Sequence, residues 1–236
     1  MDSIQIYNHE NSTVAISSKK HYIIKTENSF YYPTEEVFFQ AIDKNKLELV
    51  EVISDNPLVS IGMLVVISLM LVYYFWQVSY VIVDKNFLIS TLVLLFNVAV
   101  HECGHIITLK LLYPRSKIKL GFKFVFIYPA FYVDTSYSYF LPKYKRIAVY
   151  LAGNTANAIF VLLSMLLFPQ FNQYLYLVVS NVLINFLPIV KSDGYYAFIS
   201  LLGRYNIAKS KKATFVENFI RGLLMFLLLE ALSYFT

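Results

Sequence analysis

The chain has little cysteine and little charge, and these shortages exclude several classes of protein. Cys103 is the only cysteine among 236 residues, so no intrachain disulfide can form and a cysteine-rich structural zinc site is excluded. Charged residues make up 15% of the chain and hydrophobic residues 58%, which is too apolar for an ordinary soluble domain. Residues 1–5 have no basic stretch ahead of an apolar core, so we expect no cleaved signal peptide. The composition predicts an all-α polytopic membrane protein.

Five apolar runs approach or exceed the roughly 20 residues that cross a bilayer. They occupy residues 58–80, 87–112, 147–168, 174–190 and 215–234. Basic residues gather after the second run, before the third, and between the fourth and fifth, whereas the other connections carry little charge. By the positive-inside rule, this pattern predicts a multi-pass protein of the cell membrane with a cytoplasmic N-terminus and an external C-terminus. The formal net charge of +5 is therefore a topology signal, and we expect no nucleic-acid partner.

Residues 1–57 are polar and hold most of the acidic side chains. Short strand patterns occur at 14–16, 21–25 and 30–32. A helix start follows at Pro33, because Glu35 and Glu36 suit the positive end of a helix dipole, and residues 43–46 read as a turn. The segment predicts a small cytoplasmic α+β module ahead of a membrane domain at 58–236. It is either an N-terminal cap or a substrate-binding module, and the sequence leaves both open.

A different pattern separates the second and third apolar runs. Residues 117–124 alternate polar and apolar side chains, which is the period of a strand. Tyr128 and Pro129 suggest a turn, and a second strand would cover residues 131–133. We expect a small β-hairpin at the cytoplasmic interface. It is either an aromatic-rich connector or an edge that holds an extended peptide by strand addition.

The second apolar run contains the sequence His-Glu-Cys-Gly-His at residues 101–105. Placing an ionisable side chain at membrane depth costs free energy, so such residues are rare there and usually have a function. On a helix, His101 and His105 share one face and can hold a single Zn²⁺ through two imidazoles. Glu102 is turned away from that face, yet it can reach a water on the metal and act as its general base.

A catalytic zinc usually takes a third protein ligand and one water. The remaining histidines, His9 and His21, fall in the N-terminal segment. Among the other acids, Asp84 and Glu230 fall toward the opposite side of the membrane, and Glu217 lies at the start of the last run. Asp193 ends the fourth run on the same side of the membrane as the histidine motif. Pro188 breaks the helix five residues earlier, so the chain can carry Asp193 toward the metal. We predict Asp193 as the third ligand, with Asp134 in the hairpin loop as the alternative.

Three ordered motifs resemble the site-2 protease family of intramembrane zinc metalloproteases. The first is the histidine motif at 101–105, and the second is Gly-Asn-Thr-Ala-Asn at 153–157, which is similar to the family's G-P-x-x-N. The third, at residues 185–194, matches the family pattern N-x-x-P-x-x-x-x-D-G in order and spacing. Asn154 departs from the family's usual proline. The chain lacks a PDZ segment and looks like the compact bacterial branch of peptide zinc metalloproteases.

The resemblance implies an intramembrane zinc metalloprotease whose zinc ligands are His101, His105 and Asp193 and whose base is Glu102. It also makes Asn157 and Asn185 candidates for contacting the substrate backbone or the developing oxyanion, against the alternative that these amides link helices by hydrogen bonds. The expected substrate is a membrane-associated protein or a small precursor peptide, in peptide maturation. Expected partners are the lipid bilayer and a peptide exporter or modification enzyme from the same operon.

Two other functions compete with proteolysis. A non-proteolytic immunity or export partner could retain the metal site, and it would keep its function when Glu102 is replaced by glutamine. A transporter that relays protons or moves zinc would need further ionisable residues along a path, and the outer halves of the apolar runs offer mainly Glu230.

Overall fold

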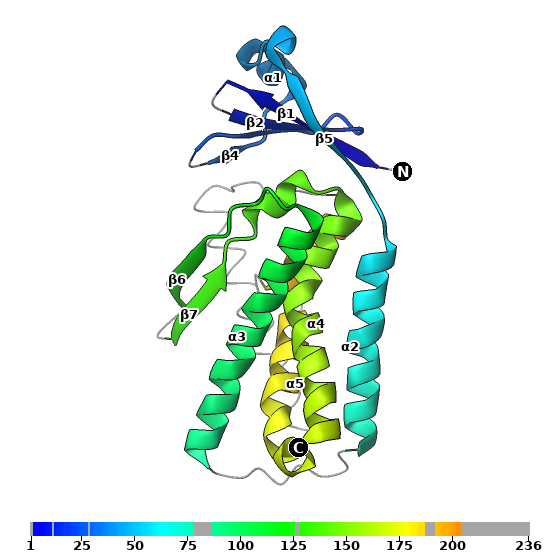
Figure 1. Cartoon of the computed structure of the whole chain (residues 1–236), viewed down its shortest axis with the longest axis vertical. Coiled ribbons are helices and arrows are strands. Elements are labelled where there is room, and N and C mark those ends of the chain that lie inside the picture. The colour runs from blue at the N-terminus through cyan, green and yellow to red at the C-terminus, as the bar shows by residue number, and fades with distance from the viewer. Residues whose placement is uncertain are drawn as a thin grey trace.

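The computed structural model describes residues 2–10, 12–27, 29–77, 86–125, 128–186 and 192–203, apart from the side chains of residues 44 and 123–130. It has two parts: a β-sheet with one short helix, and a bundle of long helices below it (Figure 1). A separate two-stranded sheet lies beside the bundle (Figure 1).

The larger sheet has five antiparallel strands in the order β4-β3-β2-β1-β5. Their bounds are β1 Ser3–His9, β2 Ser12–Ser17, β3 Tyr22–Lys25, β4 Phe30–Tyr31 and β5 Glu48–Ser54. Helix α1, Glu35–Ala41, follows β4, and a 3₁₀ turn covers Lys44–Lys46. The predicted strand patterns and helix agree with β2, β3, β4 and α1 to within one or two residues at their ends, but strands β1 and β5 were not predicted.

The two faces of the sheet bury different partners, because neighbouring residues on a strand point to opposite faces. One face packs Val14 and Tyr22 against Phe38 of α1. The other face packs Ile6 and Ile23, together with further sheet residues, against the ends of the long helices. The sheet is thus tied to the bundle by an apolar core.

Within the described residues, three helices are long and apolar enough to cross a membrane: α2, Leu58–Gln77; α3, Phe87–Leu112; and α4, Lys143–Leu167. Exposed leucine, valine and phenylalanine side chains cover α2 and α3, as is expected of surfaces that meet lipid. In α4, by contrast, 72% of the most apolar stretch is buried. Helix α4 contacts α2, α3, α5 (Asn172–Phe186) and α6 (Asp193–Leu201) and is therefore the inner helix of the bundle.

Of the five predicted spans, the first three correspond to these helices in the described part of the chain. Helix α5, Asn172–Phe186, has 15 residues and is shorter than the roughly 20 that a full crossing needs. The rest of the fourth predicted span, including Pro188, and the whole of the fifth at 215–234 lie outside the described residues. The last described helix, α6, is Asp193–Leu201.

The third span begins four residues earlier than predicted, at Lys143. Its first turn therefore includes basic residues that the sequence assigns to a loop. The carboxylate of Asp55 accepts hydrogen bonds from the backbone N–H groups of Tyr144, at 3.0 and 3.1 Å, and of Lys145, at 3.2 Å. An acid at this position satisfies the free amides of a helix start and suits its dipole. The segment after β5 thus caps the inner helix.

The predicted hairpin is confirmed as strands β6, Leu120–Val125, and β7, Tyr128–Val133, which pair antiparallel. The predicted turn at Tyr128–Pro129 is wrong by a few residues, because both residues belong to β7 and pair with β6. The residues between the strands, 126 and 127, lie outside the described part. The hairpin lies alongside α3 and leads from it to α4 (Figure 1).

Candidate metal centre

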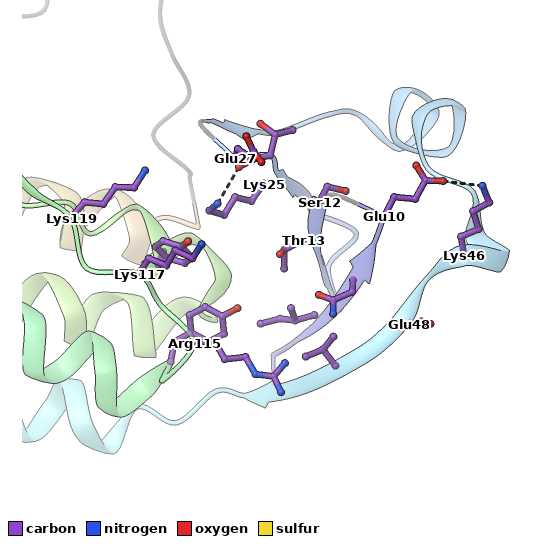
Figure 2. Close-up of a pocket in the computed structure, with 16 residues that line it drawn as sticks. Glu10, Ser12, Thr13, Lys25, Glu27, Lys46, Glu48, Arg115, Lys117 and Lys119 are labelled. Atoms are coloured by element: carbon purple, nitrogen blue, oxygen red, sulfur yellow. Dashed lines mark hydrogen bonds and ion pairs between the residues drawn. The ribbon is translucent and has the colours of Figure 1, made fainter.

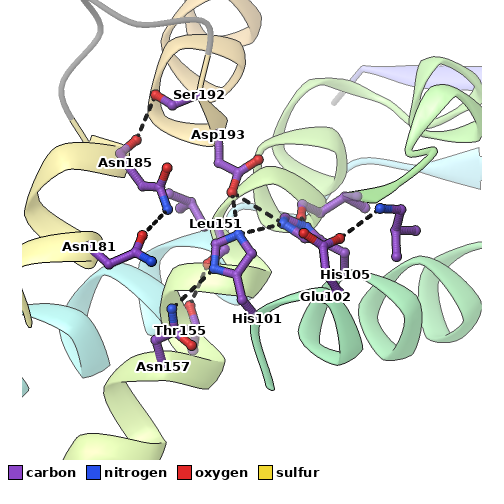
Figure 3. Close-up of polar contacts among 12 residues, drawn as sticks. His101, Glu102, His105, Leu151, Thr155, Asn157, Asn181, Asn185, Ser192 and Asp193 are labelled. Carbon is purple, nitrogen blue, oxygen red and sulfur yellow. Dashed lines mark hydrogen bonds and ion pairs between the residues drawn. The ribbon is translucent and has the colours of Figure 1, made fainter. Parts of the chain in front are cut away.

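Three potential metal ligands from two distant segments converge on one point (Figure 3). Nε2 of His101 lies 2.8 Å from Oδ2 of Asp193, Nε2 of His105 lies 3.2 Å from the same oxygen, and the two nitrogens are 3.2 Å apart. His101 and His105 sit one turn apart on α3, and Asp193 is the first residue of α6. Within the described residues, this is the one group of three such side chains that could hold a metal ion.

The second ring nitrogen of His105 has a fixed partner. Nδ1 of His105 lies 2.8 Å from the backbone carbonyl oxygen of Val149 on α4. A carbonyl can only accept, so Nδ1 carries the proton, and in the neutral imidazole Nε2 is the nitrogen left to bind a metal. Metal-bound histidines are commonly held by such a partner on the other nitrogen.

Asn157 lies behind His101. Its Nδ2 is 3.2 Å from Nδ1 of His101, while its buried Oδ1 has no hydrogen-bond partner among the described residues. With the amide rotated by 180°, Oδ1 accepts the Nδ1 proton and Nε2 of His101 is free to bind a metal. This single change satisfies the buried oxygen and gives both histidines the tautomer that a metal requires.

Gly153 on α4 makes room for the two imidazoles. A Cβ atom at this position would lie 2.4 Å from Nε2 of His101 and 2.6 Å from Nε2 of His105. Gly104 serves the packing of the same two helices, because a Cβ there would lie 2.6 Å from the carbonyl oxygen of Ala152. The glycines of two sequence motifs therefore bring α3 and α4 close together at the ligands.

Glu102 points into a cavity of about 320 Å³ that also reaches His105 and Asp193. Its Oε2 accepts a hydrogen bond of 2.7 Å from the backbone N–H of Val133, at the end of β7 (Figure 3). Tyrosine side chains line much of the remaining wall: Tyr132, Tyr139, Tyr150 and Tyr196. A carboxylate thus stands beside the three ligands without belonging to them, with room for another molecule.

The ligand set fits zinc in number, type and spacing. Zinc is held by imidazole nitrogens and carboxylate oxygens at about 2.0–2.2 Å, and tetrahedral geometry then separates the ligand atoms by roughly 3.3 Å. The separations of 2.8–3.2 Å among His101, His105 and Asp193 are close to that value. Three protein ligands leave a fourth position for water, which is the pattern of a catalytic site.

The other candidate residues from the sequence lie elsewhere. Asp134 reaches the cavity, but its carboxylate accepts the backbone N–H of Ser136 at 2.9 Å and is not part of the ligand group. Asn185 donates to Oδ1 of Asn181 at 2.7 Å, and no described contact joins its side chain to the three ligands. His9 belongs to β1 of the sheet. Substrate contacts by Asn157 and Asn185 remain predictions.

Three groups that shape the site were not identified from the sequence: two backbone groups and one glycine. The carbonyl of Val149 and the N–H of Val133 are backbone groups, and no side-chain pattern marks them. The sequence did contain a clue to the role of Gly153, because this glycine is the first residue of the second motif.

The fold and the site together define a class: a helical protein with segments long and apolar enough to cross a membrane, and with two histidines and one aspartate that could hold a metal ion beside a further carboxylate. The chain is 33% identical over 144 residues to the Bacillus subtilis (strain 168) protein named "Putative peptide zinc metalloprotease protein YydH". The match covers 55% of this chain and 52% of that protein, so the chain spans about half the length of the curated relative. It supports a relationship to zinc metalloproteases. No family model and no solved structure matches the chain.

Proposed function

We propose that the chain is an intramembrane zinc metalloprotease of the site-2 type, which hydrolyses a peptide bond in a membrane-associated protein or a small precursor peptide. The observation that carries this proposal is the convergence of His101, His105 and Asp193 beside Glu102 in one cavity. The zinc metalloprotease name of the relative supports the same chemistry.

In this proposal, His101, His105 and Asp193 hold the ion. Zinc in such a site lowers the pKa of water and stabilises the negative charge that develops on the attacked carbonyl. Glu102 accepts the proton of the attacking water and passes it to the leaving amine. The N–H of Val133 fixes one oxygen of that carboxylate, so the other oxygen is free to move the proton.

The substrate must be extended at the site, since a helix hides its carbonyl groups in hydrogen bonds. The two-stranded sheet β6–β7 ends at Glu102, and a peptide added as a third strand would lie beside the cavity. A membrane helix that unwinds locally and a short precursor peptide both meet this requirement. The proposed setting is the cell membrane, with the five-stranded sheet in the cytoplasm and with maturation or export of a peptide as the pathway.

The test uses the purified chain in detergent with zinc and a candidate precursor peptide from a neighbouring gene. Mass spectrometry should detect cleavage by the wild type, and 1,10-phenanthroline should abolish it until zinc is restored. Glu102→Gln should lower kcat/KM by about 10²–10⁴-fold while leaving the zinc content unchanged. Equal cleavage by Glu102→Gln would refute the mechanism, and full cellular function of that variant would support a non-proteolytic role.

A further inference from the structure

A second and larger cavity, of about 810 Å³, lies between the five-stranded sheet and the segment that follows α3 (Figure 2). It is separate from the metal ligands, none of which lines it. Its walls are strongly polar, with five basic and three acidic side chains, and the sheet contributes Asn8, Ser12 and Thr13. The proposed protease chemistry uses none of these residues.

One wall of the cavity carries Arg115, Lys117 and Lys119. All three side chains are exposed, while the alternate residues face the other way: Ser116 is buried and Ile118 packs against the apolar core. The core therefore anchors the segment and directs its cations into the cavity. Among the ion pairs of the described residues, none involves these three cations.

The remaining lining offsets this wall only in part, because Lys25 and Lys46 oppose Glu10, Glu27 and Glu48, and five basic side chains against three acidic ones leave a formal excess of two positive charges. Glu10 across the cavity is already paired with Lys46, at 2.9 Å. Tyr113 lines the cavity beside Arg115, and burial raises its pKa to about 12, so the phenol is uncharged at physiological pH. Figure 2 shows the three basic side chains on the helix side and Glu10 and Glu48 on the sheet side. The basic wall is left to attract an anionic ligand.

The two-walled shape favours an extended polypeptide over a lipid surface. Side chains of an extended peptide alternate between two directions, so acidic residues can face the basic wall while the others face the sheet. The side chains of Asn8, Ser12 and Thr13 can bind the peptide backbone. An anionic bilayer, by contrast, is flat and does not fit into a cavity whose basic wall faces the sheet.

The two cavities adjoin. The backbone carbonyl oxygen of Lys119, at the edge of the basic wall, accepts a hydrogen bond of 2.8 Å from the N–H of Asp134. Asp134 lines the cavity that contains Glu102. A polypeptide that lies along the basic wall can therefore extend toward the cavity of the metal centre.

We propose that the cavity bounded by Arg115, Lys117 and Lys119 binds an acidic segment of a polypeptide substrate, away from the bond that is cleaved. The identity of the polypeptide as a substrate rests on the proposed function, but the binding itself does not need the metal.

The test measures binding without cleavage. Fluorescein-labelled peptides of five Glu-Thr repeats and five Gln-Thr repeats are titrated with the purified full chain in neutral detergent, by fluorescence anisotropy. The acidic peptide should bind about tenfold more tightly than the neutral one, and added salt should weaken the binding. Lys117→Glu combined with Lys119→Glu should remove this preference. The matched control reverses two exposed lysines in the turn between β2 and β3, Lys19→Glu with Lys20→Glu, and should retain it.

Equal binding of the two peptides, or an equal loss in the control, would overturn the proposal. So would a lack of peptide binding together with attachment to phosphatidylglycerol vesicles that depends on Lys117 and Lys119, since that result assigns the wall to lipid. If the reversed protein elutes as an aggregate, Lys117→Gln with Lys119→Gln replaces it, with an expected loss of about threefold. A chain that binds the acidic peptide but cleaves nothing refutes the proposed function and leaves this site intact.

Discussion

The backbone N–H of Val133 donates a hydrogen bond of 2.7 Å to Oε2 of Glu102. This contact joins the end of the hairpin to the residue that we assign as the general base. The hairpin therefore helps to orient the Glu102 carboxylate. We expect a change in the hairpin backbone at Val133 to alter catalysis without changing any of the candidate metal ligands.

Val133→Pro tests this contact, because proline has no N–H to donate. A hydrogen bond to a charged group contributes about 1.5–3 kcal/mol, so we expect kcat/KM to fall by roughly 10–100-fold. The zinc content should stay the same. Val133→Ala keeps the N–H and is the matched control. Equal activity of the two variants would show that the contact does not orient Glu102.

Gly153→Ala is expected to damage the metal centre through packing alone. The added methyl group would lie 2.4 Å from Nε2 of His101 and displace both imidazoles. Zinc affinity, measured by competition with a chromogenic chelator, should fall at least about tenfold. Gly62→Ala on α2 is the control, because a Cβ there meets no atom within 4 Å. Unchanged zinc affinity in Gly153→Ala would contradict the arrangement of α4 against the ligands.

The choice between the two candidate aspartates is settled by zinc stoichiometry. Asp193→Asn removes a charged ligand atom that lies 2.8 Å from His101, so bound zinc should fall well below one ion per chain. Asp134→Asn keeps the ligand group and should retain zinc. Plasma mass spectrometry of the two purified variants gives the answer, and the reverse result would make Asp134 the third ligand.

Asp55→Ala should destabilise the whole molecule, because the buried carboxylate of Asp55 caps α4 from the end of the sheet. A lost helix cap costs about 1–2 kcal/mol. We expect a lower unfolding temperature in detergent, followed by tryptophan fluorescence. Asp43→Ala removes only an exposed carboxylate that accepts the N–H of Asn45, so its unfolding temperature should match the wild type. Equal shifts in both variants would argue against the cap.

Local patterns predicted much of the fold. The alternation after residue 117 predicted the hairpin, and Glu35 and Glu36 predicted the start of α1. Strand β1 was missed although Ile4 and Ile6 alternate with polar residues, which was a usable signal. Strand β5 was harder, because it is an edge strand with mostly exposed or half-exposed side chains and weak alternation.

The convergence of the candidate metal ligands was predictable from their spacing in the sequence. His101 and His105 are one helical turn apart, and the ordered motifs identified Asp193 across a long stretch of chain. The partners behind the ligands were not predictable. Val149 contributes a carbonyl and Val133 an N–H, and every residue but proline has both groups. Only the tertiary arrangement selects which ones meet the site.

The ligand pair His101 and Asp193 is separated by 92 residues of chain. An ion bound between them would act as a removable crosslink that fastens α6 to α3. Closing a loop of that length lowers the entropy of the unfolded chain by an amount equivalent to roughly 4–5 kcal/mol at 25 °C. The lifetime of the folded protein would then depend on the supply of free zinc. Zinc starvation would expose the protein to degradation and would also remove its proposed activity.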